Sequence, residues 1–281
     1  MVKFKTLVNL TRINKPIGIF LLLWPTLCAI WLASGGIPNI KILIIFILGT
    51  ILMRSAGCVA NDLADRNLDS FVERTKNRPI TSGLVSTKDA VILLLILLIF
   101  SFILVAQLNY LTIFISSAAL LFSLTYPFTK RFFSIPQLYL GVTFGFGILM
   151  AFSAIQNTIP IEAQILFISN VFWVFAYDSH YAISDMEDDR KLNIHSAPLT
   201  FNNKTILMVT LSYLLMFLGL SIIGIMKEFT ISFYVLLVLA IVVTMYGCFE
   251  SRHMEPYKNF KAFLRNNYVG FIIFAGFFSQ T

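Results

Sequence analysis

About nine stretches of roughly twenty mostly apolar residues follow one another along this 281-residue chain. A helix needs about twenty apolar residues to cross the hydrocarbon core of a bilayer. Inside lipid the backbone must satisfy its own hydrogen bonds, so such stretches cross as helices. The spans are expected near residues 16–34, 41–60, 89–107, 110–127, 137–155, 163–183, 205–226, 229–248 and 266–279. The sequence therefore predicts an all-α, polytopic membrane helical bundle of about nine transmembrane helices.

The composition agrees with a membrane protein. Hydrophobic residues make up 58% of the chain and charged residues only 12%, whereas a soluble domain carries about 25% charged residues. The first apolar run lacks a clear small-residue cleavage site, so we do not interpret it as a removable signal peptide. We expect residues 1–281 to form a single integral-membrane domain. Cys28, Cys58 and Cys248 lie far apart in apolar stretches and are interpreted as core residues.

The basic residues indicate how the chain is oriented. The net charge is +7, and if the loops alternate sides, all of the 21 lysines and arginines except Lys41 and Lys227 fall on one side. By the positive-inside rule that side is cytoplasmic, which puts the N-terminus inside and the C-terminus outside. Because this distribution accounts for the excess charge, we expect membrane lipid, and no nucleic acid, among the partners.

An acidic segment, residues 61–69, directly follows the second apolar run. Asp62, Asp65 and Asp69 are separated by three and four positions and would share one face of a helix. Asn61, Asp65 and Asp69 are separated by four and four and would share nearly the same stripe. Acidic side chains are costly beside lipid, so the segment indicates a functional site.

A second acidic segment ends the sixth span, where Asp185 and Asp189 form another pair four positions apart, with Asp188 beside Asp189. Mg²⁺ prefers oxygen ligands and usually binds through one or two carboxylates, waters and phosphate oxygens. Two such clusters on the cytoplasmic side can each hold an ion and clamp a diphosphate between them. The alternative, that these aspartates cap helices or balance nearby arginines, explains one cluster better than two. The predicted metal ligands are Asn61, Asp62, Asp65, Asp69, Asp185, Asp188 and Asp189, among which Asp65, Asp69, Asp185 and Asp189 are the predicted catalytic residues.

Further polar residues lie close to the two segments in sequence. Arg54 lies two helical turns before Asn61, where an unpaired charge costs about 3 kcal/mol, so its partner is either a substrate carboxylate or an internal aspartate. Asp178 and Tyr181 precede Asp185 at helical spacing, and they are candidates to orient an aromatic substrate or take its proton. Candidates to hold outer phosphate oxygens are Arg66, Arg78, Lys130 and Arg131, although Lys130 and Arg131 are equally well read as charges that set orientation.

These residues resemble the motifs of a known family. Residues 61–69, with Arg74-Thr75 and Asn77-Arg78-Pro79, resemble the first motif of the UbiA superfamily of intramembrane prenyltransferases. Residues 177–189 are similar to its second motif. The segments 15–26 and 126–131 look like those of the branch that prenylates 4-hydroxybenzoate. The resemblance covers essentially the whole chain.

The resemblance implies a central cavity open to lipid, with a magnesium-bound diphosphate at the cytoplasmic end, in a bacterial inner membrane. It implies the transfer of a polyprenyl chain from a polyprenyl diphosphate to 4-hydroxybenzoate, ortho to the hydroxyl, in ubiquinone synthesis. Carried onto this sequence, it gives Asn61, Asp65, Asp69, Asp185 and Asp189 as the Mg²⁺ and diphosphate residues. One departure stands out: the family usually has Lys-Ser-Thr after the second motif, and this chain has His195-Ser196-Ala197.

Other functions fit the sequence less well. The same chemistry on another aromatic acceptor remains an alternative. A secondary transporter would carry its acids near span midpoints and would have broken helices, and the glycine-rich stretch 141–147 is the one candidate for such a break. The Asp-Gly and Ala-Arg elements of CDP-alcohol phosphotransferases are missing, and a membrane scaffold would not need two acidic clusters.

Overall fold

The computed structural model describes residues 2–71 and 75–281, and within these residues the chain is helical with no strand. The nine long helices are α2 (Ile17–Ser34), α3 (Ile40–Asp65), α4 (Thr87–Val105), α5 (Tyr110–Thr129), α6 (Pro136–Gln156), α7 (Ile161–Ile183), α10 (Thr205–Met226), α11 (Ile231–Glu250) and α12 (Pro256–Phe278). The short elements are α1 (Val2–Thr11), α8 (Met186–Lys191), α9 (Ala197–Phe201) and the 3₁₀ turns η1 (Asp69–Phe71) and η2 (Asn202–Lys204). The predicted all-α class is confirmed.

Short polar residues mark where several of these helices begin. The side chains of Asn39, Ser86 and Asn109 accept hydrogen bonds from backbone amides in the first turns of α3, α4 and α5. An N-cap of this kind satisfies amides that have no partner inside the helix. Gly35 ends α2 in the left-handed conformation, with φ +61°, which glycine adopts without a side-chain clash.

Seven of the long helices in the described part of the chain are long and apolar enough to cross a membrane. The two others are α7 and α12, which carry more polar residues. The ninth span was predicted to start at 266, but α12 starts ten residues earlier, at Pro256. The first turns of α12 contain Lys258, Lys261 and Arg265, so they do not form an apolar run. All three side chains form ion pairs with Glu255 or Glu250.

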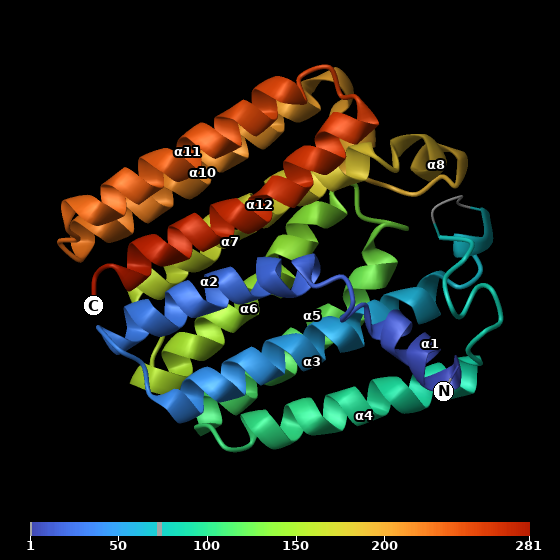
Figure 1. Cartoon of the computed structure of the whole chain (residues 1–281), viewed down its shortest axis with the longest axis horizontal. Helices are drawn as coiled ribbons and strands as arrows, with labels where there is room; N and C mark the ends of the chain where they lie inside the picture. Colours follow the sequence, from blue (N-terminus) through green and yellow to red (C-terminus); the bar gives the residue numbers. More distant parts are fainter. Residues whose placement is uncertain (1, 72–74) are drawn as a thin grey trace.

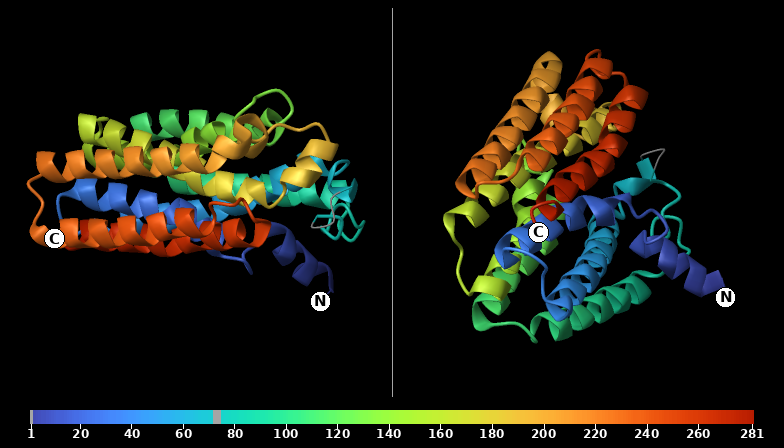
Figure 2. Two further views of the ribbon diagram at one scale, coloured as in Figure 1. Left: turned by 90° about the horizontal axis from the view of Figure 1, so that it is seen from above. Right: turned by 60° about the vertical axis from the view of Figure 1, so that its left-hand side comes forward.

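The long helices run side by side along one common direction (Figures 1 and 2). Helix α7 packs against α6, α10 and α12, while α2 packs between α6 and α12, and α3 packs against α4. The connection after α3, helix α8 and helix α1 lie at one end of the bundle, and the C-terminus lies at the other (Figure 1). The end of α3, which carries the first acidic segment, and helix α8, which with its N-cap carries the second, therefore lie at the same end of the molecule.

Close packing of α6 against α7 depends on glycine. A Cβ at Gly141 would lie 2.8 Å from the carbonyl oxygen of Val171, and one at Gly145 would lie 2.5 Å from the ring of Phe167. Helix α6 nevertheless continues without interruption from Pro136 to Gln156. The glycines of 141–147 therefore permit a helix contact and do not mark the broken helix that a transporter would require.

Candidate active site

A cavity of about 970 Å³ opens between the long helices and reaches the end of the bundle where the acidic segments lie. Its wall includes residues from α2, α3, α5, α6 and α7. Residues of both acidic segments line it, namely Asn61, Asp62, Asp65, Asp69, Asp185 and Asp189. The structure therefore brings six of the seven predicted metal ligands to one cavity, from two segments more than a hundred residues apart in sequence.

The spacing predicted that the first acidic segment lies on one continuous helix, and the structure shows that it does not. Helix α3 ends at Asp65, and Asp69 lies in the 3₁₀ turn η1. Asp62, Asp65 and Asp69 are nevertheless all buried, with 1%, 1% and 5% of their surface exposed. The turn thus folds Asp69 back toward the end of α3 instead of extending the stripe.

Two of the predicted phosphate-binding residues, Arg78 and Lys130, form ion pairs with these carboxylates. Arg78 Nη1 donates to both carboxylate oxygens of Asp69, at 3.0 and 2.8 Å, and lies 3.2 Å from Asp62 Oδ1. Lys130 Nζ donates to Asp65 Oδ2 at 2.5 Å. The other oxygen of Asp65 is buried and has no hydrogen-bond partner among the described residues. These basic side chains therefore balance part of the charge of the first acidic segment.

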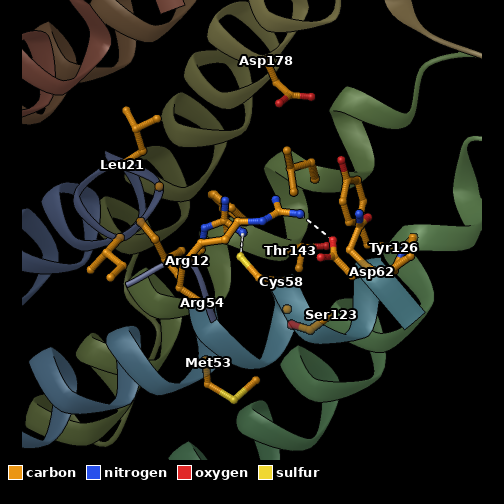
Figure 3. Close-up of a pocket in the computed structure, with 18 of the residues that line it drawn as sticks. Arg12, Leu21, Met53, Arg54, Cys58, Asp62, Ser123, Tyr126, Thr143 and Asp178 are labelled. Atoms are coloured by element: carbon orange, nitrogen blue, oxygen red, sulfur yellow. Dashed lines mark hydrogen bonds and ion pairs between the residues drawn. The ribbon is translucent and has the colours of Figure 1, made fainter. Parts of the chain in front are cut away.

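Arg12 is a site residue that the sequence reasoning missed, since it counted only as an orienting charge. It follows α1 with a left-handed backbone, φ +56°. Its Nη2 donates to Asp62 Oδ1 at 2.5 Å (Figure 3). A basic residue shortly before the first span was the only signal in the sequence, and nothing there linked it to a carboxylate 50 positions away.

Deeper in the cavity, Arg54 of α3 makes no close ion pair with a carboxylate among the described residues. Its Nη1 donates to Cys58 Sγ at 3.2 Å, and its Nε is buried without a hydrogen bond among the described residues. Asp178 and Tyr181 of α7 line the same cavity. Figure 3 shows Arg54 and Asp178 on different helices around this space, with Tyr126 on a third. Asp178 is also close enough to interact with the charge of Arg54, so both partners predicted for Arg54, a substrate carboxylate and an internal aspartate, stay open.

Three predicted site residues do not line this cavity. Arg66 and Arg131 donate to backbone carbonyls in the last turns of α3, at 2.9 and 2.8 Å, and line a separate open groove. Asp188 is half-buried, with 32% of its side chain exposed, and lies 3.4 Å from Lys191. Arg66 and Asp188 each directly adjoin a cavity residue, and one position along a helix turns a side chain about 100° away. Arg74 lies outside the described residues.

The donor atoms of the cavity match Mg²⁺. No three His, Cys, Asp or Glu side chains of the described residues form a group that holds a metal by itself. Mg²⁺ does not require such a group, because it usually takes one or two carboxylates and completes its shell with phosphate and water oxygens. Carboxylate and amide oxygens from two segments, including the unpartnered Asp65 Oδ1, supply ligands of this kind.

Comparison with known proteins gives one family. The model of the UbiA prenyltransferase family matches residues 22–272. A 4-hydroxybenzoate octaprenyltransferase from Nitrosomonas eutropha is 47% identical over 99% of this chain and 98% of its own. A protein of the same name from Methylobacillus flagellatus is 48% identical over 98% of this chain and 93% of its own.

Solved structures give the same fold. The apo structure of a UbiA homolog from Aeropyrum pernix K1 matches with a TM-score of 0.80 at 24% identity, covering 92% of this chain and 96% of that one. A UbiA homolog from Archaeoglobus fulgidus bound to GPP and Mg²⁺ matches with a TM-score of 0.74 at 18% identity, covering 98% and 99%. At these identities the likeness concerns the arrangement of the helices.

Proposed function

The chain belongs to the UbiA prenyltransferase family, and we propose that it transfers a polyprenyl group from a polyprenyl diphosphate to 4-hydroxybenzoate. The new bond joins the allylic carbon to the ring carbon ortho to the hydroxyl, diphosphate leaves, and the product serves ubiquinone synthesis. Identity of 47% over nearly the whole length of a relative named for this reaction carries the proposal. The two acidic segments on one cavity support it.

The six cavity-lining ligands, Asn61 and the five aspartates from the two segments, are the residues that would hold Mg²⁺ with the diphosphate. When bound there, Mg²⁺ supplies positive charge to the leaving group. Asp188 does not line the cavity and is left out of this set.

Arg78 and Lys130 are proposed to hold the outer phosphate oxygens. Both line the cavity and already lie on carboxylates of the first acidic segment. A cation held by those carboxylates would balance their charge, and the guanidinium and the ammonium would then be able to donate to phosphate oxygens. Arg66 and Arg131 line the separate groove and are left out of this role.

The aromatic acid is proposed to bind deeper, with its carboxylate on Arg54. A guanidinium matches a planar carboxylate in geometry and charge. Asp178 and Tyr181 line the cavity near it and are proposed to orient the ring or take the proton that the ring loses. The apolar cavity wall keeps water from the allylic carbon, where it would compete with the ring.

The protein is an integral membrane protein with apolar candidate spans. We propose a bacterial inner membrane, with the N-terminus and the active site on the cytoplasmic side. The distribution of lysine and arginine supports this orientation, because the charged ends of α1, α3 and α8 lie together (Figure 1).

Membranes containing the protein should convert labelled 4-hydroxybenzoate to a prenylated product when a polyprenyl diphosphate and Mg²⁺ are present, and EDTA should stop the reaction. A series of donor lengths measures the chain-length preference. Arg54→Ala should raise the KM for the aromatic acid more than the KM for the donor. Transfer to dihydroxynaphthoate or haem in place of 4-hydroxybenzoate would overturn the proposed acceptor.

A further inference from the structure

The first turn of α2 contacts the Arg54 guanidinium at a residue with no side chain, Gly18. A Cβ built at Gly18 would lie 2.6 Å from Arg54 Nε, 2.6 Å from Nη2 and 3.0 Å from Cζ. Non-bonded carbon and nitrogen atoms do not approach this closely, since favourable contacts lie near 3.5–4.0 Å. A side chain at position 18 and the guanidinium in its present place therefore exclude each other.

Gly18 differs from a glycine that merely lets two helices approach. At Gly141, the nearest atoms to an added Cβ include the backbone of Val171, so a side chain there would push α6 and α7 apart. At Gly18, all three nearest atoms belong to the Arg54 guanidinium. The missing side chain thus creates space for a functional group and not for a helix.

Apart from the contact with Gly18, the guanidinium is restrained by one hydrogen bond and by the nearby charge of Asp178. Its Nη1 donates to Cys58 Sγ, 3.2 Å away, and its buried Nε has no hydrogen-bond partner among the described residues. Gly18, Arg54 and Cys58 all line the cavity. If α2 presented a side chain at position 18, the end of Arg54 would turn about its flexible stem into another position.

We propose that Gly18 is a positioning residue for the aromatic substrate, because its lack of a side chain sets where the Arg54 guanidinium meets the carboxylate. The inference rests on the proposed function, in which Arg54 binds that carboxylate. Displacement by about 1 Å is enough to weaken a contact strongly, since productive binding requires close geometry. The helix itself loses nothing, because alanine is the better helix former.

The test is Gly18→Ala, with KM measured separately for 4-hydroxybenzoate and for the polyprenyl diphosphate. The KM for the aromatic acid should rise at least tenfold, the KM for the donor should change less than twofold, and the melting temperature should not fall. Gly247→Ala is the matched control, because Gly247 also lies in a helix, does not line the cavity, and a Cβ there would meet only Ala262 Cβ at an ordinary contact distance of 3.7 Å. It should leave both KM values near those of the wild type.

A second variant separates positioning from general damage. Lysine lacks the broad planar fork of arginine, so Arg54→Lys should fit beside an alanine at position 18. The KM of the double variant for the acid should be no higher than that of Arg54→Lys alone. If the increase in KM caused by Gly18→Ala instead multiplies the increase caused by Arg54→Lys, the inference is overturned. If Arg54→Ala raises the KM for the acid while Gly18→Ala does not, this inference fails alone. If Arg54→Ala leaves that KM unchanged, the carboxylate assignment in the proposed function fails.

Discussion

Replacing Lys130 by methionine tests whether a cation must balance the buried carboxylate of Asp65. Lys130 Nζ lies 2.5 Å from Asp65 Oδ2, the Asp65 side chain is 2% exposed, and its Oδ1 has no partner in the described part of the chain. Methionine keeps the length and apolar stem of lysine. In the ligand-free protein, Lys130→Met therefore leaves a buried negative charge without its ion-pair partner.

The structure sets the size of the effect. Removing one partner of a buried ion pair costs about 3–5 kcal/mol, and because Lys130 is 26% exposed, we expect the lower end, about 3 kcal/mol. At about 2 °C per kcal/mol, the melting temperature in EDTA should fall by about 6 °C. Lys191→Met is the matched control, since Lys191 is 73% exposed and 3.4 Å from Asp188. Such a surface pair contributes about 0–1 kcal/mol, so its loss should shift the melting temperature by no more than about 2 °C.

Thermal unfolding of the purified protein, followed by circular dichroism, measures both shifts. Adding Mg²⁺ should raise the melting temperature of Lys130→Met more than that of the wild type, because the ion replaces the lost charge and binds the folded state. Adding Asp65→Asn to Lys130→Met should recover most of the lost stability. Equal melting temperatures for wild type and Lys130→Met in EDTA, or an equal gain from Mg²⁺, would refute this reasoning.

Three further outcomes follow from the structure. Asp185→Asn should lower turnover of labelled 4-hydroxybenzoate by about 10²-fold or more, which is the typical effect of removing one charge-stabilising group from an enzyme active site. The yield of protein in the membrane should stay normal. Near-normal turnover would contradict the proposed Mg²⁺ site. Lys227→Met breaks the pair with Glu162, 2.5 Å apart at the other end of the bundle, and should lower the melting temperature by about 2 °C without any change in turnover or any rescue by Mg²⁺. Asn266→Leu removes the acceptor of the buried Trp173 Nε1, now 2.8 Å away, and should cost about 1–3 kcal/mol in thermal unfolding, with both KM values unchanged.

The sequence predicted the features that depend on neighbours along the chain. Apolar runs gave the long helices, because a helix in lipid needs length and apolar side chains and little else. The spacing of Asp62 and Asp65 correctly placed both on the cavity side of α3. The same rule failed beyond the helix end: Asp69 reaches the cavity through η1, and α12 begins within a charged stretch that no apolar run reveals.

By itself the amino-acid order determined that this protein is a membrane-spanning helical bundle with two acidic segments, since helix length, periodicity and charge are local properties. Only the folded bundle decided which side chains meet. Arg12 reaches Asp62 across 50 positions, and Lys130 reaches Asp65 across 65. The close approach of Gly18 to Arg54 likewise joins two helices. Contacts between helices depend on how all the helices pack at once, and no spacing along one helix records that arrangement.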